Sequence, residues 1–200
     1  MVILAVLALV LGVLVGTFDV QNFLLDALVS NKDLVLYLLM FSVGMSIGLH
    51  KGIIRKIKEY HVKILIIPAG IIVGTLLGGG FLSMITKYNV GESTSVVSGL
   101  GWYSLAGVTI GNLAGAQLGS IAFLSNLMRE IFSFFTIPFI AKHFNYYSCI
   151  APAAATSEDT TLPMMMKYTN EETVVLSVIN GVLCSAVVPI LIPLCYQLKF

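Results

Sequence analysis

Long apolar runs with few or no charged residues dominate this chain. The clearest are Ile64–Ile85 and Thr173–Tyr196, and a third, Met1–Gly16, opens the sequence. At about 1.5 Å of rise per residue, a helix of about 20 residues crosses the hydrocarbon core of a bilayer. The whole chain is 58% hydrophobic and only 10% charged, whereas ordinary soluble proteins carry about 25% charged residues. We therefore predict an integral membrane protein.

The first part of the chain is predicted to cross the membrane three times, at Met1–Gly16, Leu34–Leu49 and Ile64–Ile85. Met1–Gly16 resembles a signal peptide in length, but it lacks a basic n-region and a convincing cleavage site. The segment His50–Lys63 holds five of the eleven basic residues. By the positive-inside rule this segment is cytoplasmic, and the N-terminus is then cytoplasmic too. A basic helix lying on the membrane surface would give the same sidedness.

Two later segments are apolar but irregular. Val96–Ala116 is crowded with glycines and interrupted by polar residues, and Tyr146–Met166 is half a span followed by a polar stretch and Pro163. Leu118–Ile140, between them, is a regular span. We predict an all-α, polytopic membrane protein with about seven membrane segments, of which the two irregular ones are broken or re-entrant.

Charge and cysteine content exclude several classes of protein. Lys and Arg number 11 and Asp and Glu number 10, for a formal net charge of +1, which is too small to attract nucleic acid. The three cysteines, Cys149, Cys184 and Cys195, lie in apolar sequence without CxxC spacing, so we expect neither a disulfide framework nor a metal site. The sequence also lacks an HExxH box and a phosphate-binding loop. We expect neither an enzyme nor a bound cofactor.

Glu130 is the first candidate for a functional group, because it lies near the middle of the span Leu118–Ile140. An ionisable side chain there costs at least about 2.5–3.5 kcal/mol on insertion scales. A narrow stripe of the same helix holds Glu130 together with Gly119, Asn126 and Ser133. That stripe must face protein or water. The alternative is a structural ion pair with a basic group, although Arg129 lies about 100° away around the helix.

The second candidate is the polar segment Thr156–Thr161, TSEDTT, between two apolar half-segments. Consecutive polar residues cannot lie against hydrocarbon, so the segment is either an aqueous loop or an unwound break that lines a cavity. Broken helices offer free N–H and C=O groups and terminal dipoles, which suit the ammonium and carboxylate ends of an amino acid. The break would use side chains of this segment, with Thr156, Ser157, Asp159 and Thr160 as candidates.

The third candidate is the glycine-rich segment Gly99–Gly107, which contains Trp102, Tyr103 and Ser104. Its aromatic side chains are able to shield an aliphatic stem or to hold a cation on a ring face. The alternatives are an aromatic belt at the membrane interface and close helix packing through the glycines.

Three motifs, in order and spacing, resemble the lysine exporter family. They are GWYSL at Gly101–Leu105, FLSNLMREI at Phe123–Ile131 and ATSEDTTLP at Ala155–Pro163. The resemblance implies a multi-pass exporter of L-lysine in the plasma membrane of a prokaryote, driven by exchange of protons or other cations. It also implies roles for Glu130 and Asp159, which match the two acids of the family motifs, whereas Glu158 occupies a variable place.

Longer members of that family begin with about three additional spans that look like a copy of the first three here. When a unit with an odd number of spans is repeated, the second copy has the opposite orientation in the membrane. This sequence shows one copy of the three-span unit, so we expect the oppositely oriented copy to come from another chain. The expected assembly is a homodimer or a heteromer with a small three-span partner.

We thus predict one transporter domain over residues 1–200, with a three-span unit at 1–86 and a core at 90–200. It exports L-lysine or a similar basic amino acid, coupled to a proton or cation through Glu130 and Asp159. Two alternatives stay open: a cation/proton antiporter that uses the same acids, and a non-transporting membrane subunit of a heteromeric transporter.

Overall fold

The computed structural model describes residues 2–18 and 63–198, and single residues at 30, 31, 34, 38, 41 and 45. All regular elements in these residues are helices. The chain divides into two compact units, Met1–Met45 and Ser46–Phe200. Most of the expected span Leu34–Leu49 and of the basic segment His50–Lys63 lies outside the described residues.

In the first unit, the helix α1 (Val2–Thr17) forms where the first span was predicted. Its sequence, VILAVLALVLGVLVGT, has no charged residue and no proline. Large apolar side chains on it are exposed, among them Leu7, Leu11 and Leu14. Such a surface suits a lipid environment.

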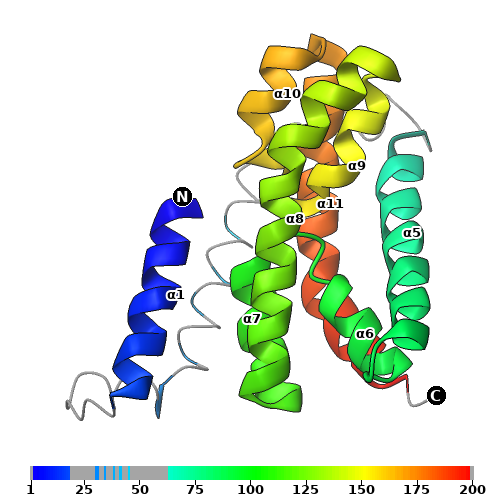
Figure 1. Ribbon diagram of the computed structural model, residues 1–200. Coiled ribbons are helices and arrows are strands. Elements are labelled where there is room, and N and C mark those ends of the chain that lie inside the picture. The colour runs from blue at the N-terminus through cyan, green and yellow to red at the C-terminus, as the bar shows by residue number, and fades with distance from the viewer. Residues whose placement is uncertain are drawn as a thin grey trace. The chain divides into compact units, whose positions relative to one another are not determined.

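The second unit contains three long helices, α5 (Lys63–Ile85), α8 (Ala116–His143) and α11 (Glu171–Tyr196), which run the height of the bundle (Figure 1). Among the described residues, these three are long and apolar enough to cross a membrane. The prediction of a helical membrane protein is therefore supported, but the expected count of about seven segments is not confirmed.

Both segments that the sequence predicted to be irregular are interrupted helices. We define hairpin 1 as α6 (Val90–Val97) and α7 (Tyr103–Ala114) with the turn between them. Hairpin 2 consists of short helical pieces: η1 (Tyr147–Cys149), α9 (Ile150–Ala153), η2 (Ala154–Glu158) and α10 (Leu162–Tyr168).

The two hairpins enter the bundle from opposite ends. In Figure 1, α6 and α7 occupy the lower half, whereas α9 and α10 occupy the upper half. Each hairpin returns to the end of the bundle from which it started. This path favours a re-entrant loop over a broken span, the two alternatives that the sequence left open.

Caps and proline positions explain where these elements begin. The Asn89 side chain accepts a hydrogen bond from the Glu92 amide at 2.8 Å, and the Glu92 carboxylate accepts one from the Asn89 amide at 3.0 Å, which forms a capping box before α6. Asn170 caps α11 by accepting from the Thr173 amide at 2.9 Å. Pro163 lies in the first turn of α10, where a missing N–H costs little.

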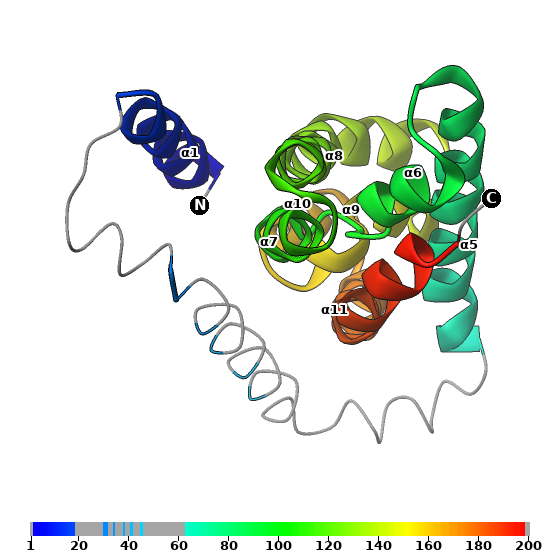
Figure 2. The same cartoon turned by 90° about the horizontal axis from the view of Figure 1, so that it is seen from below.

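Glycines allow α7 to pack closely against α8, the most extensive contact between two elements of this unit. A Cβ atom on Gly119 would come within 2.6 Å of the Gly111 Cα, and one on Gly107 within 2.9 Å of the Phe123 Cβ. Seen along the bundle, α7 and α8 lie side by side on one flank, while α5, α6 and α11 form the other (Figure 2). Small residues bring two backbones together in this way.

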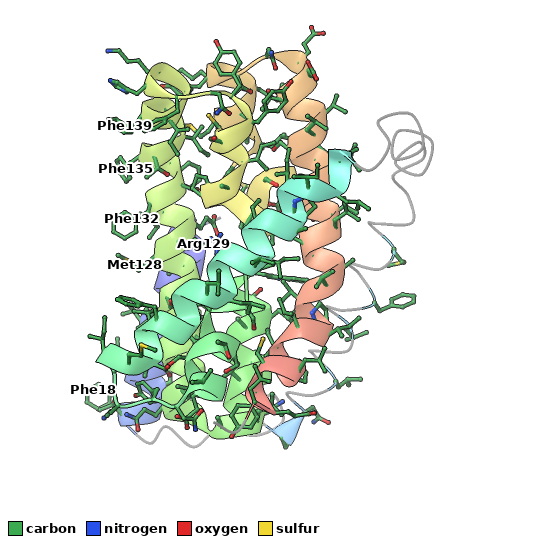
Figure 3. All side chains as sticks on the ribbon, turned by 90° about the vertical axis from the view of Figure 1, so that its right-hand side faces the viewer. Phe18, Met128, Arg129, Phe132, Phe135 and Phe139 are labelled. Atoms are coloured by element: carbon green, nitrogen blue, oxygen red, sulfur yellow. The ribbon has the colours of Figure 1, made fainter. Side chains whose placement is uncertain are left out.

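The outer face of α8 carries a row of exposed apolar side chains. Met128, Phe132, Phe135 and Phe139 project away from the bundle in Figure 3, and Phe135 is 71% exposed. The inner face of the same helix buries Asn126, Glu130 and Ser133. The stripe predicted from the sequence therefore faces protein, and the opposite face suits lipid.

Candidate functional site

The site lies where the tips of the two hairpins meet, which are residues 96–101 of hairpin 1 and 154–160 of hairpin 2. The Ala155 amide of hairpin 2 donates a hydrogen bond to the Leu100 carbonyl of hairpin 1 at 3.0 Å. Each tip contains a non-glycine residue with positive φ, Leu100 at 51° and Ala154 at 50°, and both are fully buried. A positive φ at a residue other than glycine costs about 1–3 kcal/mol of conformational free energy, and it persists only where surrounding contacts fix the backbone.

Asn126 of α8 holds the tip of hairpin 1. Its Oδ1 accepts from the Gly101 amide at 2.8 Å, and its Nδ2 donates to the Val96 carbonyl at 2.8 Å. A Cβ on Gly99 would come within 2.7 Å of the Asn126 amide group, so only glycine leaves room for these bonds. Asn126 was a predicted binding residue, and its hydrogen-bonding groups are engaged in holding the backbone of the tip.

Residues of α11 hold the tip of hairpin 2 in a similar way. The Asn180 Nδ2 donates to the Ala154 carbonyl at 2.9 Å and to the Ser157 Oγ at 3.0 Å. Ser157 and Ser177 each donate to the other's carbonyl, at 2.8 and 2.6 Å. Ser157 is fully buried, so this predicted site residue lies in the contact between hairpin 2 and α11.

Arg129 joins α8 to α5 and to hairpin 2. Its Nε and Nη2 donate to the carbonyls of Pro152 and Ala151 at 3.2 and 3.1 Å, and its Nη1 donates to the Thr75 hydroxyl at 3.2 Å. The two carbonyls belong to the C-terminal end of α9, where a positive charge is favourable. Within the described residues, Arg129 bonds no carboxylate, so it is not the structural partner of Glu130.

Glu130 lies next to Arg129 in the sequence but in a different environment. It is 1% exposed, and neither carboxylate oxygen has a hydrogen-bond partner among the described residues. The Thr160 hydroxyl is adjacent and also lacks a partner there, and Asp159 is close enough to interact electrostatically. Tyr103 of hairpin 1 lies near both acids. The structure thus brings Tyr103, Glu130, Asp159 and Thr160 into one neighbourhood.

The three acids of this region differ in their surroundings. Glu130 is buried, Asp159 is exposed and accepts from the Thr160 amide, and Glu158 is half-buried. The Glu158 carboxylate accepts from the Ser185 hydroxyl at 2.8 Å. A Cβ on Gly181 would come within 2.5 Å of the Glu158 Cβ, so a glycine on α11 is what lets Glu158 lie against that helix.

The remaining predicted residues lie around the tips. Tyr103 begins α7 and packs edge-on against Phe123, with ring centroids 5.2 Å apart. Trp102 and Ser104, on either side of it, are half-buried. Thr156 is buried, and its hydroxyl donates to the Ala153 carbonyl at 2.9 Å, so this side chain is engaged within hairpin 2.

Sequence reasoning missed the polar residues of α11. Ser177, Asn180 and Ser185 contact hairpin 2, and they fall on one face of the helix together with Gly181. A polar stripe at three- to four-residue spacing inside the span Thr173–Tyr196 was the signal that could have found them.

Comparison with known proteins places the chain in a family. The family model described as "Lysine exporter LysO" matches residues 6–196. A protein of Escherichia coli named lysine exporter LysO is 29% identical over 161 residues, which are 80% of this chain and 53% of that protein. A protein of Haemophilus influenzae, provisionally named a lysine exporter, is 32% identical over 79% of this chain and 80% of its own length.

The chain thus spans about half the length of its Escherichia coli relative. No solved structure matches it. The family match covers almost the whole sequence, including both hairpins and the helices that hold them. The chain therefore belongs to the lysine exporter family.

Proposed function

We propose that this chain exports L-lysine, or a similar basic amino acid, as a secondary transporter. In this proposal Glu130 and Asp159 bind either the ammonium groups of the substrate or an exchanged proton or cation, and not both at once. Two cationic loads that compete for one anionic site are the minimal way to couple two fluxes. The names of the relatives support the substrate.

The observation that carries the proposal is the Glu130 carboxyl group, which is 1% exposed and without a hydrogen-bond partner in the described residues. A buried, unpaired carboxylate is strongly disfavoured, so the group needs a proton or a cation as its companion. Arg129 does not supply the compensating charge, because its hydrogen bonds go to Pro152, Ala151 and Thr75. Exchange of a proton for an ammonium group keeps Glu130 compensated throughout a transport cycle.

The surroundings of Glu130 suit an amino acid with an aliphatic stem. Tyr103 offers a ring surface near the acids, with Trp102 next to it in the sequence, and the unwound backbone at the hairpin tips offers polar groups for the α-amino and α-carboxyl ends. We also assign to the substrate the hydroxyls of Thr160, beside Glu130, and of Ser104, which follows Tyr103 in the sequence.

Uptake of labelled lysine into everted membrane vesicles tests this function. We expect uptake that depends on this chain and on an imposed proton or cation gradient. Cation exchange without lysine movement would support a cation/proton antiporter that uses the same acids. Uptake only in the presence of a second protein would make the chain a subunit of a heteromeric transporter.

We place the chain in the plasma membrane of a prokaryote, with the N-terminus in the cytoplasm. The basic residues of the segment 50–63, just before α5, support this orientation. Fusing a reporter that is active on only one side of the membrane to the N-terminus tests it. Activity of an external reporter would reverse the assignment.

We further propose that α5 contacts another transmembrane unit, either a second copy of this chain or a small three-span protein. Gly70, Gly74 and Gly78 lie along one exposed face of α5, and a Cβ on any of them would meet nothing within 4 Å. Faces of this kind allow close helix contact in membranes. Mass measurement after mild-detergent extraction should show a dimer or heteromer, and Gly74→Leu should convert it to a monomer.

A further inference from the structure

The two hairpins and the helices that follow them form two equivalent units. Leu100 precedes Asn126 by the same number of residues as Ala154 precedes Asn180. The first residue of each pair has the positive φ of its hairpin tip, and the second is the buried asparagine that bonds that tip. Leu100 and Ala154 are 54 residues apart, and the same 54 residues separate the end of α7 at Ala114 from the end of α10 at Tyr168.

These units are inverted with respect to each other. Hairpin 1 and the start of α8 lie at the lower end of the bundle in Figure 1, whereas hairpin 2 and the start of α11 lie at the upper end. Contacts between residues agree with this arrangement, because Gly111 of α7 lies against Gly119 near the start of α8, while Ala151 lies against Arg129 further along α8. Inverted repeats of this kind underlie alternating access in many transporters.

Each hairpin is tied more firmly to its own long helix than to the other hairpin. Among the described residues, the bond from the Ala155 amide to the Leu100 carbonyl is the sole hydrogen bond between the two hairpins. Asn126 makes two hydrogen bonds to the tip of hairpin 1, and Asn180 makes two to the tip of hairpin 2. Replacing Asn126 should therefore release the tip of hairpin 1 alone, and replacing Asn180 should release the tip of hairpin 2 alone.

We propose that the two hairpins are equivalent gates that open the site around Glu130 to opposite sides of the membrane, and that Asn126 and Asn180 are the equivalent positioning residues that hold them closed. With the segment 50–63 in the cytoplasm, α5 runs outward, so hairpin 1 at its far end faces the outside and hairpin 2 faces the cytoplasm. The inference rests on the proposed function only in assuming that some solute crosses at these tips.

The test is a sided thiol-labelling experiment on the full chain. Thr160→Cys serves as the reporter, because the Thr160 hydroxyl is beside Glu130 and makes no hydrogen bond to a described residue. The three native cysteines are replaced by alanine. A charged, membrane-impermeant thiol reagent is then applied to right-side-out vesicles and to everted vesicles, so that access from each side is measured separately.

Asn126→Ala should raise labelling from the outside roughly tenfold, and Asn180→Ala should raise labelling from the cytoplasmic side by a similar factor, the scale expected for losing one or two buried hydrogen bonds. Ser125→Ala and Val178→Ala, beside the asparagines, are the matched controls and should change neither rate. Where an alanine variant does not reach the membrane, Asn126→Ser and Asn180→Ser replace it.

Increased labelling from the same side for both asparagine variants, or unchanged labelling in both, would overturn the proposal. If an asparagine variant raises the labelling rate of Thr160→Cys equally from both sides of the membrane, the substitution has loosened the whole fold. That result would also contradict separate gates. Labelling does not depend on the transported solute. Opposite-sided labelling with no lysine flux would therefore refute the proposed substrate and leave the gates standing.

Discussion

Arg129 and Glu130 are consecutive residues of α8, yet among the described residues the charged group of Arg129 is hydrogen-bonded and that of Glu130 is not. The Arg129 guanidinium makes three hydrogen bonds, two of them to carbonyls at the end of α9, while the Glu130 carboxylate makes none to a described residue. Arg129 is thus a positive charge that holds the structure together, and Glu130, beside it in the same turn of helix, is an acid without a compensating partner among the described residues. The acid is what we assign to transport.

Replacing Arg129 should destabilise the protein. Hydrogen bonds to a charged group contribute about 1.5–3 kcal/mol each, and Arg129→Gln removes the charge that faces the C-terminal carbonyls of α9. We expect the melting temperature in detergent to fall by roughly 5–10 °C. Lys167→Gln, at an exposed position, is the control and should melt as the wild type does. An Arg129→Gln protein as stable as this control would mean that the carbonyl contacts contribute little.

Cysteines in the polar segment of hairpin 2 should react unequally with a small charged thiol reagent. Ser157 is fully buried between hairpin 2 and α11, so Ser157→Cys should stay unlabelled. Thr160 is half-buried beside Glu130, so Thr160→Cys should react, and lysine should slow its reaction. Rapid labelling at both positions, unaffected by lysine, would favour an ordinary aqueous loop.

A methyl group at the contact between α7 and α8 should be poorly tolerated. Gly119→Ala places a Cβ within 2.6 Å of the Gly111 Cα, which is backbone and cannot move aside alone. Overpacking typically costs about 1–3 kcal/mol, so we expect lower yield and a lower melting temperature. Gly80→Ala is the matched control, because its Cβ would meet nothing within 4 Å. Equal behaviour of the two variants would contradict the close packing of these helices.

Much of this architecture is readable from the sequence, for physical reasons that differ by element. α5, α8 and α11 were predictable because a long apolar run has few alternatives in a membrane. The irregular segments were recognisable from glycines and the run TSEDTT. That each hairpin returns to its own end of the bundle was not, because this depends on contacts between residues far apart in sequence, such as the hydrogen bond from the Ala155 amide to the Leu100 carbonyl.

The candidate site was predictable in part. Glu130 stood out because an acid in a span is costly, and the family motifs added Asp159. The roles of Asn126 and Ser157 could not be read from the sequence, because polar residues that bind a substrate and those that hold an unwound backbone follow the same pattern. Only the hydrogen bonds of Asn126 to Gly101 and Val96 show which use is made of it.

The two exposed or half-buried acids of hairpin 2 should contribute unequally to transport. Asp159 lies near Glu130 and Tyr103, whereas the Glu158 carboxylate accepts a hydrogen bond from Ser185 on α11. Asp159→Asn should therefore reduce lysine flux in everted vesicles far more than Glu158→Gln does. A larger loss from Glu158→Gln would move the second acid of the site to Glu158.

The most direct test of the central claim is labelled-lysine flux in proteoliposomes that contain the purified chain, with and without Glu130→Gln. The amide keeps the shape of the side chain and loses its ionisation, so the variant should insert and fold normally but carry no lysine. Glu171→Gln, at the exposed start of α11, is the control and should transport as the wild type does. Undiminished, gradient-driven lysine flux through Glu130→Gln would remove Glu130 from the mechanism and contradict this account.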